Sequence, residues 1–255
     1  MQLNLQGKTA LVTGASKGIG RAIANVLAEE GCHLHLVART KTDLAAVRDA
    51  LCARHQVSIT IHPLDLSVGG NVRALIAACP DIDILVNNAG AIPGGTLDAV
   101  DEARWRAAWD LKVFGYINMT REIYAQMKAR RSGVIINVIG TGGERPTATY
   151  IAGGAGNAAL MAFTRAMGAV SANDGIRLLA VNPGMIETER LTALAQGMAG
   201  GVESPAWQKM LAGLPFGRAG KPEEVADLVA FLASERASYI SGTVITIDAG
   251  ASARG

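Results

Sequence analysis

The stretch TALVTGASKGIG, residues 9–20, decides the fold. Its first five residues are predicted to form a strand, whose apolar centre Ala10-Leu11-Val12 is typical of a parallel strand buried on both faces. Three glycines follow in a Gly-x-x-x-Gly-x-Gly pattern, and an amphipathic helical pattern then continues to Gly31. In this setting Gly14 permits a tight turn, Gly18 lets a phosphate approach the backbone, and Gly20 allows the helix to pack closely on the strand. The free N–H groups at the start of the helix predict a pyrophosphate site, and the alternative is a glycine-rich turn without a ligand.

The same alternation of apolar runs and helical patterns continues along the chain. Further strands are predicted at 33–38, 57–62, 82–87, 133–138, 176–181 and 244–247, with helices around 41–54, 70–79, 99–130, 149–171 and 222–234. Strands separated by single helices imply right-handed crossovers. The chain is therefore predicted to be one doubly wound α/β domain of Rossmann type over residues 1–255, a seven-stranded parallel sheet with helices on both faces. The segment 185–215 lacks a long periodic run and is predicted to be a lid inserted over the site.

Composition excludes several other classes of protein. The chain has 255 residues, of which 49% are hydrophobic and 18% charged, and a formal net charge of +2. These values argue against a disordered chain and against nucleic acid as a partner. Three separated cysteines suggest no disulfide framework, and scattered histidines without a carboxylate cluster suggest no metal site. With no signal peptide or membrane span in the pattern, we expect a cytoplasmic protein.

A second motif, Asn87-Asn88-Ala89-Gly90, ends the fourth predicted strand, at the sheet edge where ligands bind in such folds. Together with the glycine motif it resembles the short-chain dehydrogenase/reductase family, over nearly the whole chain. Asp65, Asn182-Pro183-Gly184, Thr188 and the tail from Gly217 to Gly250 match as well. The resemblance implies a Rossmann fold, a nicotinamide dinucleotide cofactor and an oxidoreductase that acts on a carbonyl or an alcohol.

The resemblance also assigns cofactor contacts residue by residue. The implied residues are Gly14, Ser16, Gly18, Ile19 and Gly20 at the diphosphate, Asp65 and Leu66 at the adenine, Asn88, Ala89 and Gly90 at the adenosine ribose, and Pro183, Gly184, Ile186 and Thr188 at the nicotinamide. The second strand ends in Val37-Ala38-Arg39-Thr40, which contains no acid to bind a free 2′-hydroxyl. Arg39 and Lys17 therefore favour NADP(H), with NAD(H) as the alternative if both are merely solvated charges.

The catalytic half of the family pattern is altered. The family uses Asn, Ser, Tyr and Lys, and the matching positions here are Lys112, Gly140, Tyr150 and Gly154. One hypothesis is that Lys112 brings an ammonium to Tyr150 from another helix, which would favour the phenolate. Thr141 would then supply a hydroxyl in place of the missing serine. The alternatives are that Lys112 is solvated or salt-bridged and that Thr141 caps a turn.

Three hypotheses for function follow. The first is an NADP(H)-dependent oxidoreductase with Tyr150 as acid/base and Lys112 as a rearranged cation. The second is a dinucleotide-binding protein without redox turnover, and the third is a non-redox enzyme on the same fold. Apolar residues between 185 and 215 suggest an apolar or amphipathic small-molecule substrate, or packing against a partner subunit. The resemblance implies a homotetramer or homodimer built on the long helix and the helix that follows Tyr150.

Overall fold

The computed structural model describes residues 2–196 and 201–254. Its centre is a seven-stranded sheet in the order β3-β2-β1-β4-β5-β6-β7 with every pair of neighbours parallel. The strands are β1 Thr9–Thr13, β2 His33–Ala38, β3 Ile59–Pro63, β4 Ile84–Asn87, β5 Gly133–Val138, β6 Ile176–Pro183 and β7 Val244–Ile247. The predicted doubly wound α/β domain is confirmed.

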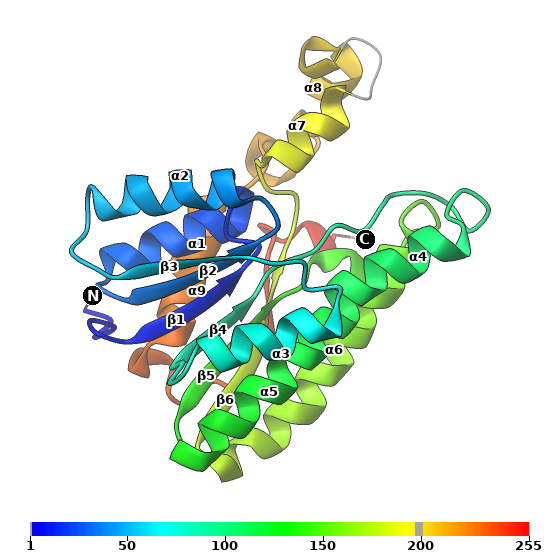
Figure 1. Cartoon of the computed structure of the whole chain (residues 1–255). Helices are drawn as coiled ribbons and strands as arrows, with labels where there is room; N and C mark the ends of the chain where they lie inside the picture. The colour runs from blue at the N-terminus through cyan, green and yellow to red at the C-terminus, as the bar shows by residue number, and fades with distance from the viewer. Residues whose placement is uncertain (1, 197–200, 255) are drawn as a thin grey trace.

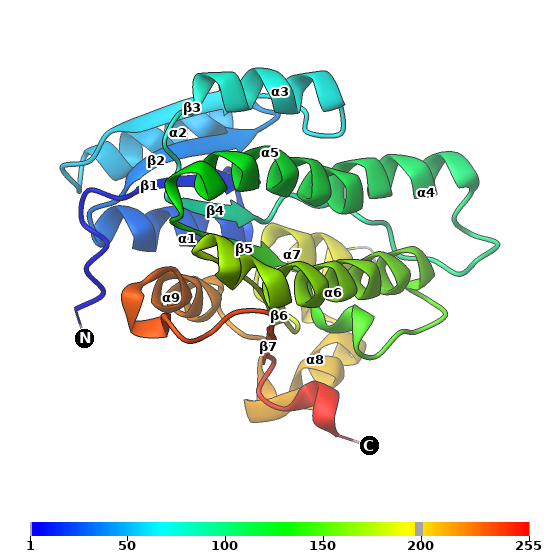
Figure 2. The same cartoon turned by 90° about the horizontal axis from the view of Figure 1, so that it is seen from below.

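Helices cover both faces of this sheet. On one face lie α1 Gly18–Glu29, α2 Lys41–Cys52 and α9 Pro222–Ala233, and on the other lie α3 Gly69–Ala78, α5 Gly115–Arg130 and α6 Ile151–Ser171 (Figure 1, Figure 2). Each face buries its own apolar cluster. Val12, Leu27 and Val229 are fully buried on the first face, and Leu11, Leu85 and Ile123 on the second. Neighbouring residues of β1 thus enter opposite clusters, which explains why Ala10, Leu11 and Val12 are all apolar.

The long helix predicted at 99–130 is divided in the structure. Helix α4, Glu102–Trp109, begins where the Asp101 side chain accepts a hydrogen bond from the Arg104 backbone N–H. A π-helical turn, Asp110–Phe114, joins it to α5. Such a turn inserts one residue into the helix and rotates the following side chains, so it often marks a functional position. Here it carries Lys112.

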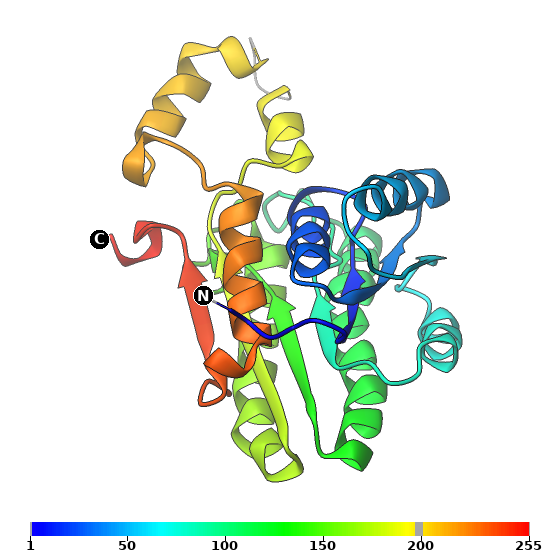
Figure 3. The same cartoon turned by 90° about the vertical axis from the view of Figure 1, so that its left-hand side faces the viewer.

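The segment 185–215 contains helices that the sequence pattern did not predict. Helix α7, Glu189–Gln196, and helix α8, Pro205–Ala212, stand away from the body of the molecule, on the side toward which the strands point (Figure 3). Residues 197–200, which belong to the predicted lid, lie outside the described residues. Within the described part of the chain, no helix combines the length and the apolar character that crossing a membrane requires.

Candidate cofactor cleft and active site

The ends of β1 and β4 are tied together at the edge of the sheet. The Thr13 hydroxyl oxygen accepts hydrogen bonds from the backbone N–H groups of Asn88 (2.9 Å) and Ala89 (3.0 Å). The Asn88 side-chain amide donates in turn to the backbone oxygens of Thr13 and Gly14. These bonds fix the two loops that carry the predicted cofactor residues against one another.

Two glycines of the first loop are required by close packing. A Cβ at Gly14 would lie 2.9 Å from the Cα of Ala89, and a Cβ at Gly20 would overlap the backbone oxygen of Gly14. Gly20 lies in the first turn of α1, together with Gly18 and Ile19. The helix therefore starts directly behind the loop, with its N-terminal N–H groups beside it, as a pyrophosphate site demands.

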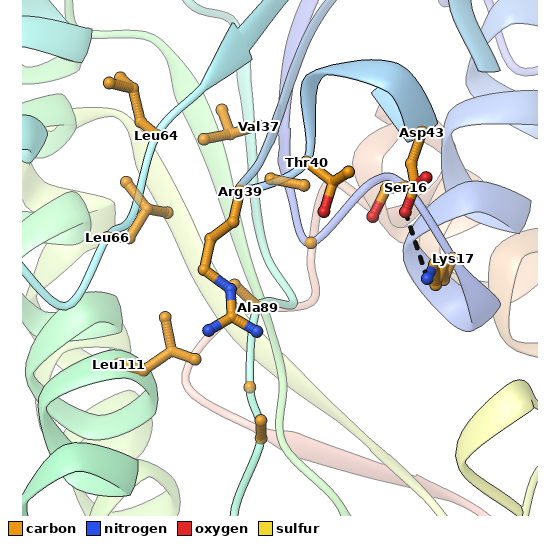
Figure 4. Close-up of a pocket in the computed structure, with 14 residues that line it drawn as sticks. Ser16, Lys17, Val37, Arg39, Thr40, Asp43, Leu64, Leu66, Ala89 and Leu111 are labelled. Atoms are coloured by element: carbon orange, nitrogen blue, oxygen red, sulfur yellow. Dashed lines mark ion pairs between the residues drawn. The ribbon is translucent and has the colours of Figure 1, made fainter. Parts of the chain in front are cut away.

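An open cleft runs from this loop across the ends of β2 and β3 (Figure 4). The residues that line it are Gly14, Ser16, Lys17, Val37, Ala38, Arg39, Thr40, Asp43, Leu64, Leu66, Ala89, Gly90, Ala91 and Leu111. Seven predicted cofactor residues (Gly14, Ser16, Lys17, Arg39, Leu66, Ala89 and Gly90) are among them. The structure therefore brings together residues from four separate strand ends.

The two predicted phosphate-binding cations take different directions in the cleft. Lys17 forms an ion pair with Asp43 at 3.2 Å, whereas the Arg39 side chain extends across the cleft toward Ala89 and Leu111 (Figure 4). Between them Thr40 precedes α2 without capping it through its side chain. The first N–H groups of α2 therefore remain available to an anion beside the two cations.

The predicted adenine residues follow β3. The Asp65 carboxylate accepts hydrogen bonds from the backbone N–H and the hydroxyl of Ser67, at 3.0 and 2.7 Å. These bonds lower the pKa of Asp65, and the Arg39 charge lowers it further, so the carboxylate is ionised. Leu66 is buried and forms part of the cleft wall.

The predicted nicotinamide residues lie where the chain leaves β6 for α7. The Gly184 N–H donates to the Ile247 oxygen, which holds this loop on β7, and Ile186 pairs with Gly220. The Thr188 methyl group lies beside Gly18, where a Cβ would approach it to 3.0 Å. Pro183, the last residue of β6, begins this loop, which reaches back to the start of α1.

Lys112 is buried inside the site. Its Nζ donates to the Ile139 backbone oxygen at 2.6 Å, and its methylene chain lies against Gly90, where a Cβ would be 2.8 Å from Cδ. Burial lowers the pKa of Lys112 to about 7, with a smaller contribution from the charge of Arg190. The lysine therefore changes its charge near neutral pH. Lys112 is only 9% exposed and forms no ion pair with the residues that the structure describes, which argues against a solvated or salt-bridged lysine.

Tyr150 requires a correction to the predicted helix. Helix α6 begins at Ile151, and Tyr150 precedes it with φ −138° and ψ 41°. Its ring folds back over Gly153, where a Cβ would overlap the ring carbons. The i, i+4 spacing from Tyr150 to Gly154 therefore does not describe one helical face. Gly154 instead faces Gly142 and Pro146.

The α6 side chain that reaches Gly140 is Asn157. Its amide nitrogen donates to the Gly140 backbone oxygen at 3.2 Å, and its Oδ1 is buried without a hydrogen-bond partner. Asn157 is only 3% exposed, so this unpaired acceptor is buried beside the loop at Gly140. Thr141 begins a short 3₁₀ turn, and its backbone oxygen accepts from Glu144 and Arg145. No hydrogen bond of its hydroxyl is present among the described residues.

These features fit a dinucleotide. The Gly14–Gly20 cradle would be filled by any side chain, the helix N-termini and two cations suit phosphates, and Leu66 and Leu111 suit an aromatic base. A doubly wound sheet with this cleft at its carboxyl edge defines a dinucleotide-binding protein of Rossmann type.

The comparisons with known proteins agree with this class. The family model described as enoyl-(acyl carrier protein) reductase matches residues 14–252. The chain is similar to the 3-oxoacyl-[acyl-carrier-protein] reductase FabG of Escherichia coli strain K12, with 34% identity over 252 residues that cover 97% of this chain and 98% of the relative. The chain belongs to the short-chain dehydrogenase/reductase family.

Solved structures show the same fold. The L-sorbose reductase of Gluconobacter frateurii, complexed with NADPH and L-sorbose, has a TM-score of 0.91 and 31% identity, and 98% of each chain is covered. YwfH, an NADPH-dependent reductase involved in bacilysin biosynthesis, has a TM-score of 0.90 and 30% identity, covering 96% of this chain and 98% of its own.

Sequence reasoning missed three groups of residues that the structure brings together. Asn157 was missed because the helix was counted from Tyr150. Arg190, whose guanidinium donates to the Ile92 oxygen at 2.6 Å, was missed because α7 was not predicted. His35, His62 and Cys79 meet beside the edge strand β3, although no metal site was expected. The available signal for that cluster was one histidine in each of two consecutive predicted strands, His35 and His62.

Proposed function

We propose that this chain is an NADP(H)-dependent oxidoreductase that interconverts a carbonyl compound and an alcohol. The observation that carries the proposal is the position of Lys112. The cofactor cleft and the buried lysine share a wall at Gly90, and Lys112 Nζ lies at the Ile139 oxygen, directly before Gly140. A proton-donating group thus stands beside a dinucleotide site, although the family's usual serine is replaced by glycine.

Arg39, Lys17 and the first N–H groups of α2 would hold the 2′-phosphate of NADP(H). The glycine loop and the start of α1 would hold the diphosphate, and Leu66 and Leu111 would flank the adenine. When bound, the reduced cofactor supplies a hydride to the substrate. The NADPH-bound and NADPH-dependent reductases of the same fold support this choice of cofactor.

Lys112 would supply the proton, a role that the first hypothesis from the sequence gave to Tyr150. As an ammonium it has three N–H groups, and one of them is engaged by the Ile139 oxygen. The others can donate to a carbonyl oxygen and transfer a proton as that oxygen gains negative charge. Because the pKa of Lys112 is lowered to about 7, the proton is held loosely enough to be given up near neutral pH.

Tyr150 and Asn157 would orient the substrate and the cofactor. The Tyr150 ring, held over Gly153, packs with Ile92 and Val100 in an apolar cluster at the mouth of the site. The Asn157 Oδ1 can accept a hydrogen bond from a hydroxyl group of the cofactor or substrate. Thr141, whose hydroxyl is uncommitted within the described residues, stays a candidate for contact with substrate.

The lid and the assembly form the remaining part of the proposal. Segment 185–215 would close over an apolar or amphipathic small molecule, since Arg190 of α7 already reaches the Ile92 oxygen. A homotetramer or homodimer would cover the exposed Leu97 and Phe114, which border an apolar groove with Trp105 and Trp109. The cytoplasm is the proposed location, and the free cysteines are compatible with it.

The test is NADPH oxidation at 340 nm with a broad panel of aldehydes and ketones. Wild-type protein is compared with Lys112→Met, and with Lys8→Met as a control directly before β1, at the opposite end of that strand from the cleft. We expect carbonyl-dependent oxidation by the wild type and the control, and loss of turnover with unchanged NADPH affinity in Lys112→Met. Turnover that survives in Lys112→Met would remove the lysine from the chemistry.

A further inference from the structure

His35, His62 and Cys79 form a compact cluster away from the cofactor cleft. His35 lies in β2 and His62 in β3, and Cys79 is the residue that follows α3. The register pairs His35 with Thr60 and His62 with Val37, so both imidazoles project from the same face of the sheet. That face is the one covered by α3, which brings the thiol of Cys79 onto the two rings.

The three potential ligand atoms converge on one point. His35 Nδ1 lies 2.9 Å from His62 Nε2, and Cys79 Sγ lies 3.3 Å from the first nitrogen and 3.5 Å from the second. All three atoms lie within 4.8 Å of one another. The ring planes are 20° apart and the ring centroids 5.2 Å apart, so the two nitrogens face one another along the line between the rings.

Without a metal, one N–H···N hydrogen bond joins the two rings, and it leaves the thiol proton without a partner among these two nitrogens. Each of the two ring nitrogens carries either one proton or one in-plane lone pair, and the thiol has a single weak donor. If one nitrogen donates to the other, the acceptor's lone pair is used, and the Cys79 proton has no free nitrogen to meet. A cation at the centre would let both nitrogens and the sulfur act as electron-pair donors at the same time.

The spacing is close to that of a tetrahedral metal site. With Zn–N near 2.0–2.1 Å and Zn–S near 2.3 Å, ligand atoms lie about 3.3–3.6 Å apart. The two sulfur–nitrogen distances of 3.3 and 3.5 Å already agree, and the nitrogen–nitrogen distance of 2.9 Å would have to open by about 0.4 Å. Both rings would also have to turn so that the lone pairs of the facing nitrogens meet at the ion.

We propose that His35, His62 and Cys79 bind one Zn²⁺ ion, with a water molecule as the fourth ligand. Nitrogen and thiolate ligands in a tetrahedral set favour zinc over magnesium or calcium. Cys79 is fully buried, whereas both histidines are partly exposed, which leaves a route for the ion and the water from one side. Binding releases the thiol proton, so the site gains a thiolate as it gains the metal.

A Zn²⁺ ion at this site would stabilise the fold and would take no part in hydride transfer. It would tie the edge strand β3 to the end of α3, and β3 leads within three residues of His62 to Asp65 and the adenine side of the cleft. A ligand that binds only the folded chain stabilises it by mass action. The melting temperature should therefore rise with Zn²⁺ and fall when a chelator is added.

The test is metal binding by the full chain, prepared without a histidine tag and stripped with a chelator. Zn²⁺ is titrated against a chromophoric indicator, and Co²⁺ is used as a spectroscopic probe. We expect one ion per chain, visible Co²⁺ bands of tetrahedral geometry and a thiolate-to-cobalt absorption in the near ultraviolet. Cys79→Ser and His62→Gln should each weaken binding at least tenfold.

Two controls isolate the cluster. Cys52→Ser removes an exposed cysteine and His33→Ala removes the neighbouring histidine of β2, and both should bind like the wild type. NADPH binding by each variant reports that it is folded. If a Cys79 or His62 variant does not fold, the wild-type cobalt spectrum decides alone. Absence of the thiolate band, or equal binding by Cys79→Ser and wild type, would overturn the proposal.

Discussion

Replacing Lys112 with methionine should stabilise the protein while it removes turnover. Methionine keeps the length and the apolar character of the lysine stem but has no charge to bury. The pKa of Lys112 falls from its ordinary value of 10.5 to about 7 on folding, chiefly because the ammonium is desolvated. At about 1.36 kcal/mol for each unit of pKa, this change corresponds to about 4–5 kcal/mol of unfavourable charging at neutral pH.

The hydrogen bond to the Ile139 oxygen offsets part of this cost. Its loss, which leaves the carbonyl oxygen unpaired, costs about 1–2 kcal/mol in the variant. We therefore expect Lys112→Met to raise the free energy of unfolding by about 3 kcal/mol at pH 7. A gain of this size is large beside the typical stability of a domain, about 5–15 kcal/mol.

The pH dependence gives the sign of the effect. The unfolded chain keeps the Lys112 proton up to about pH 10.5, whereas the folded chain releases it near pH 7. Between these values the unfolded state binds more protons, so wild-type stability rises with pH, and below pH 7 the full penalty is present. Urea unfolding at pH 7 and pH 9.5 should show the advantage of Lys112→Met shrinking as pH rises. A destabilised variant, or an advantage independent of pH, would refute the assignment of a buried, charged lysine.

Four other outcomes are expected. Carbonyl reduction should fall as pH rises above about 7, because Lys112 loses the proton that it donates, and a rate that stays flat to pH 9 in initial-rate assays would contradict this role. Arg39→Ala should weaken NADPH binding at least tenfold while NADH binding changes little, since a charge-assisted bond contributes about 1.5–3 kcal/mol. Fluorescence titration measures both affinities, and an equal loss for both cofactors would argue against a 2′-phosphate contact. Gly153→Ala should displace the Tyr150 ring and lower kcat/KM, whereas Gly69→Ala, which meets no atom within 4 Å, should not, and equal values for the two variants would refute the packing argument. Tyr150→Phe keeps the ring and removes only the hydroxyl, so it should change kcat and KM little because the ring orients the substrate, and steady-state kinetics with a large fall in kcat would indicate that the phenol moves the proton.

The sequence predicted the parts of the fold that depend on local pattern. The strand at Thr9–Thr13 and the helix after it were found because burial on both faces demands a continuous apolar run, and a helix on the sheet demands a 3.6-residue period. The third strand was predicted at 57–62, but its ladder with β2 begins at Ile59. The first residue of such a strand is set by its pairing with the neighbouring strand. The sequence of the strand alone does not show that pairing.

The site was predicted less completely because it depends on contacts between distant elements. Residues of the glycine loop and Arg39 reached the expected cleft, since they follow strand ends directly. The π-helical turn that buries Lys112 has no local signature, and neither does the fold of the Tyr150 ring over Gly153. Because α6 begins one residue after Tyr150, the α6 side chain that contacts Gly140 is that of Asn157.

The central claim is that this chain carries out redox chemistry with NADP(H) although its catalytic positions are altered. Its most direct test is the rate of NADPH oxidation by purified wild-type protein at pH 7 with a panel of aldehydes and ketones, each paired with a carbonyl-free blank. We predict saturable oxidation of NADPH with at least one carbonyl compound, and formation of one molecule of the matching alcohol for each NADPH oxidised. Saturable NADPH binding with no carbonyl-dependent oxidation across the panel would contradict it and would identify the chain as a dinucleotide-binding protein without turnover.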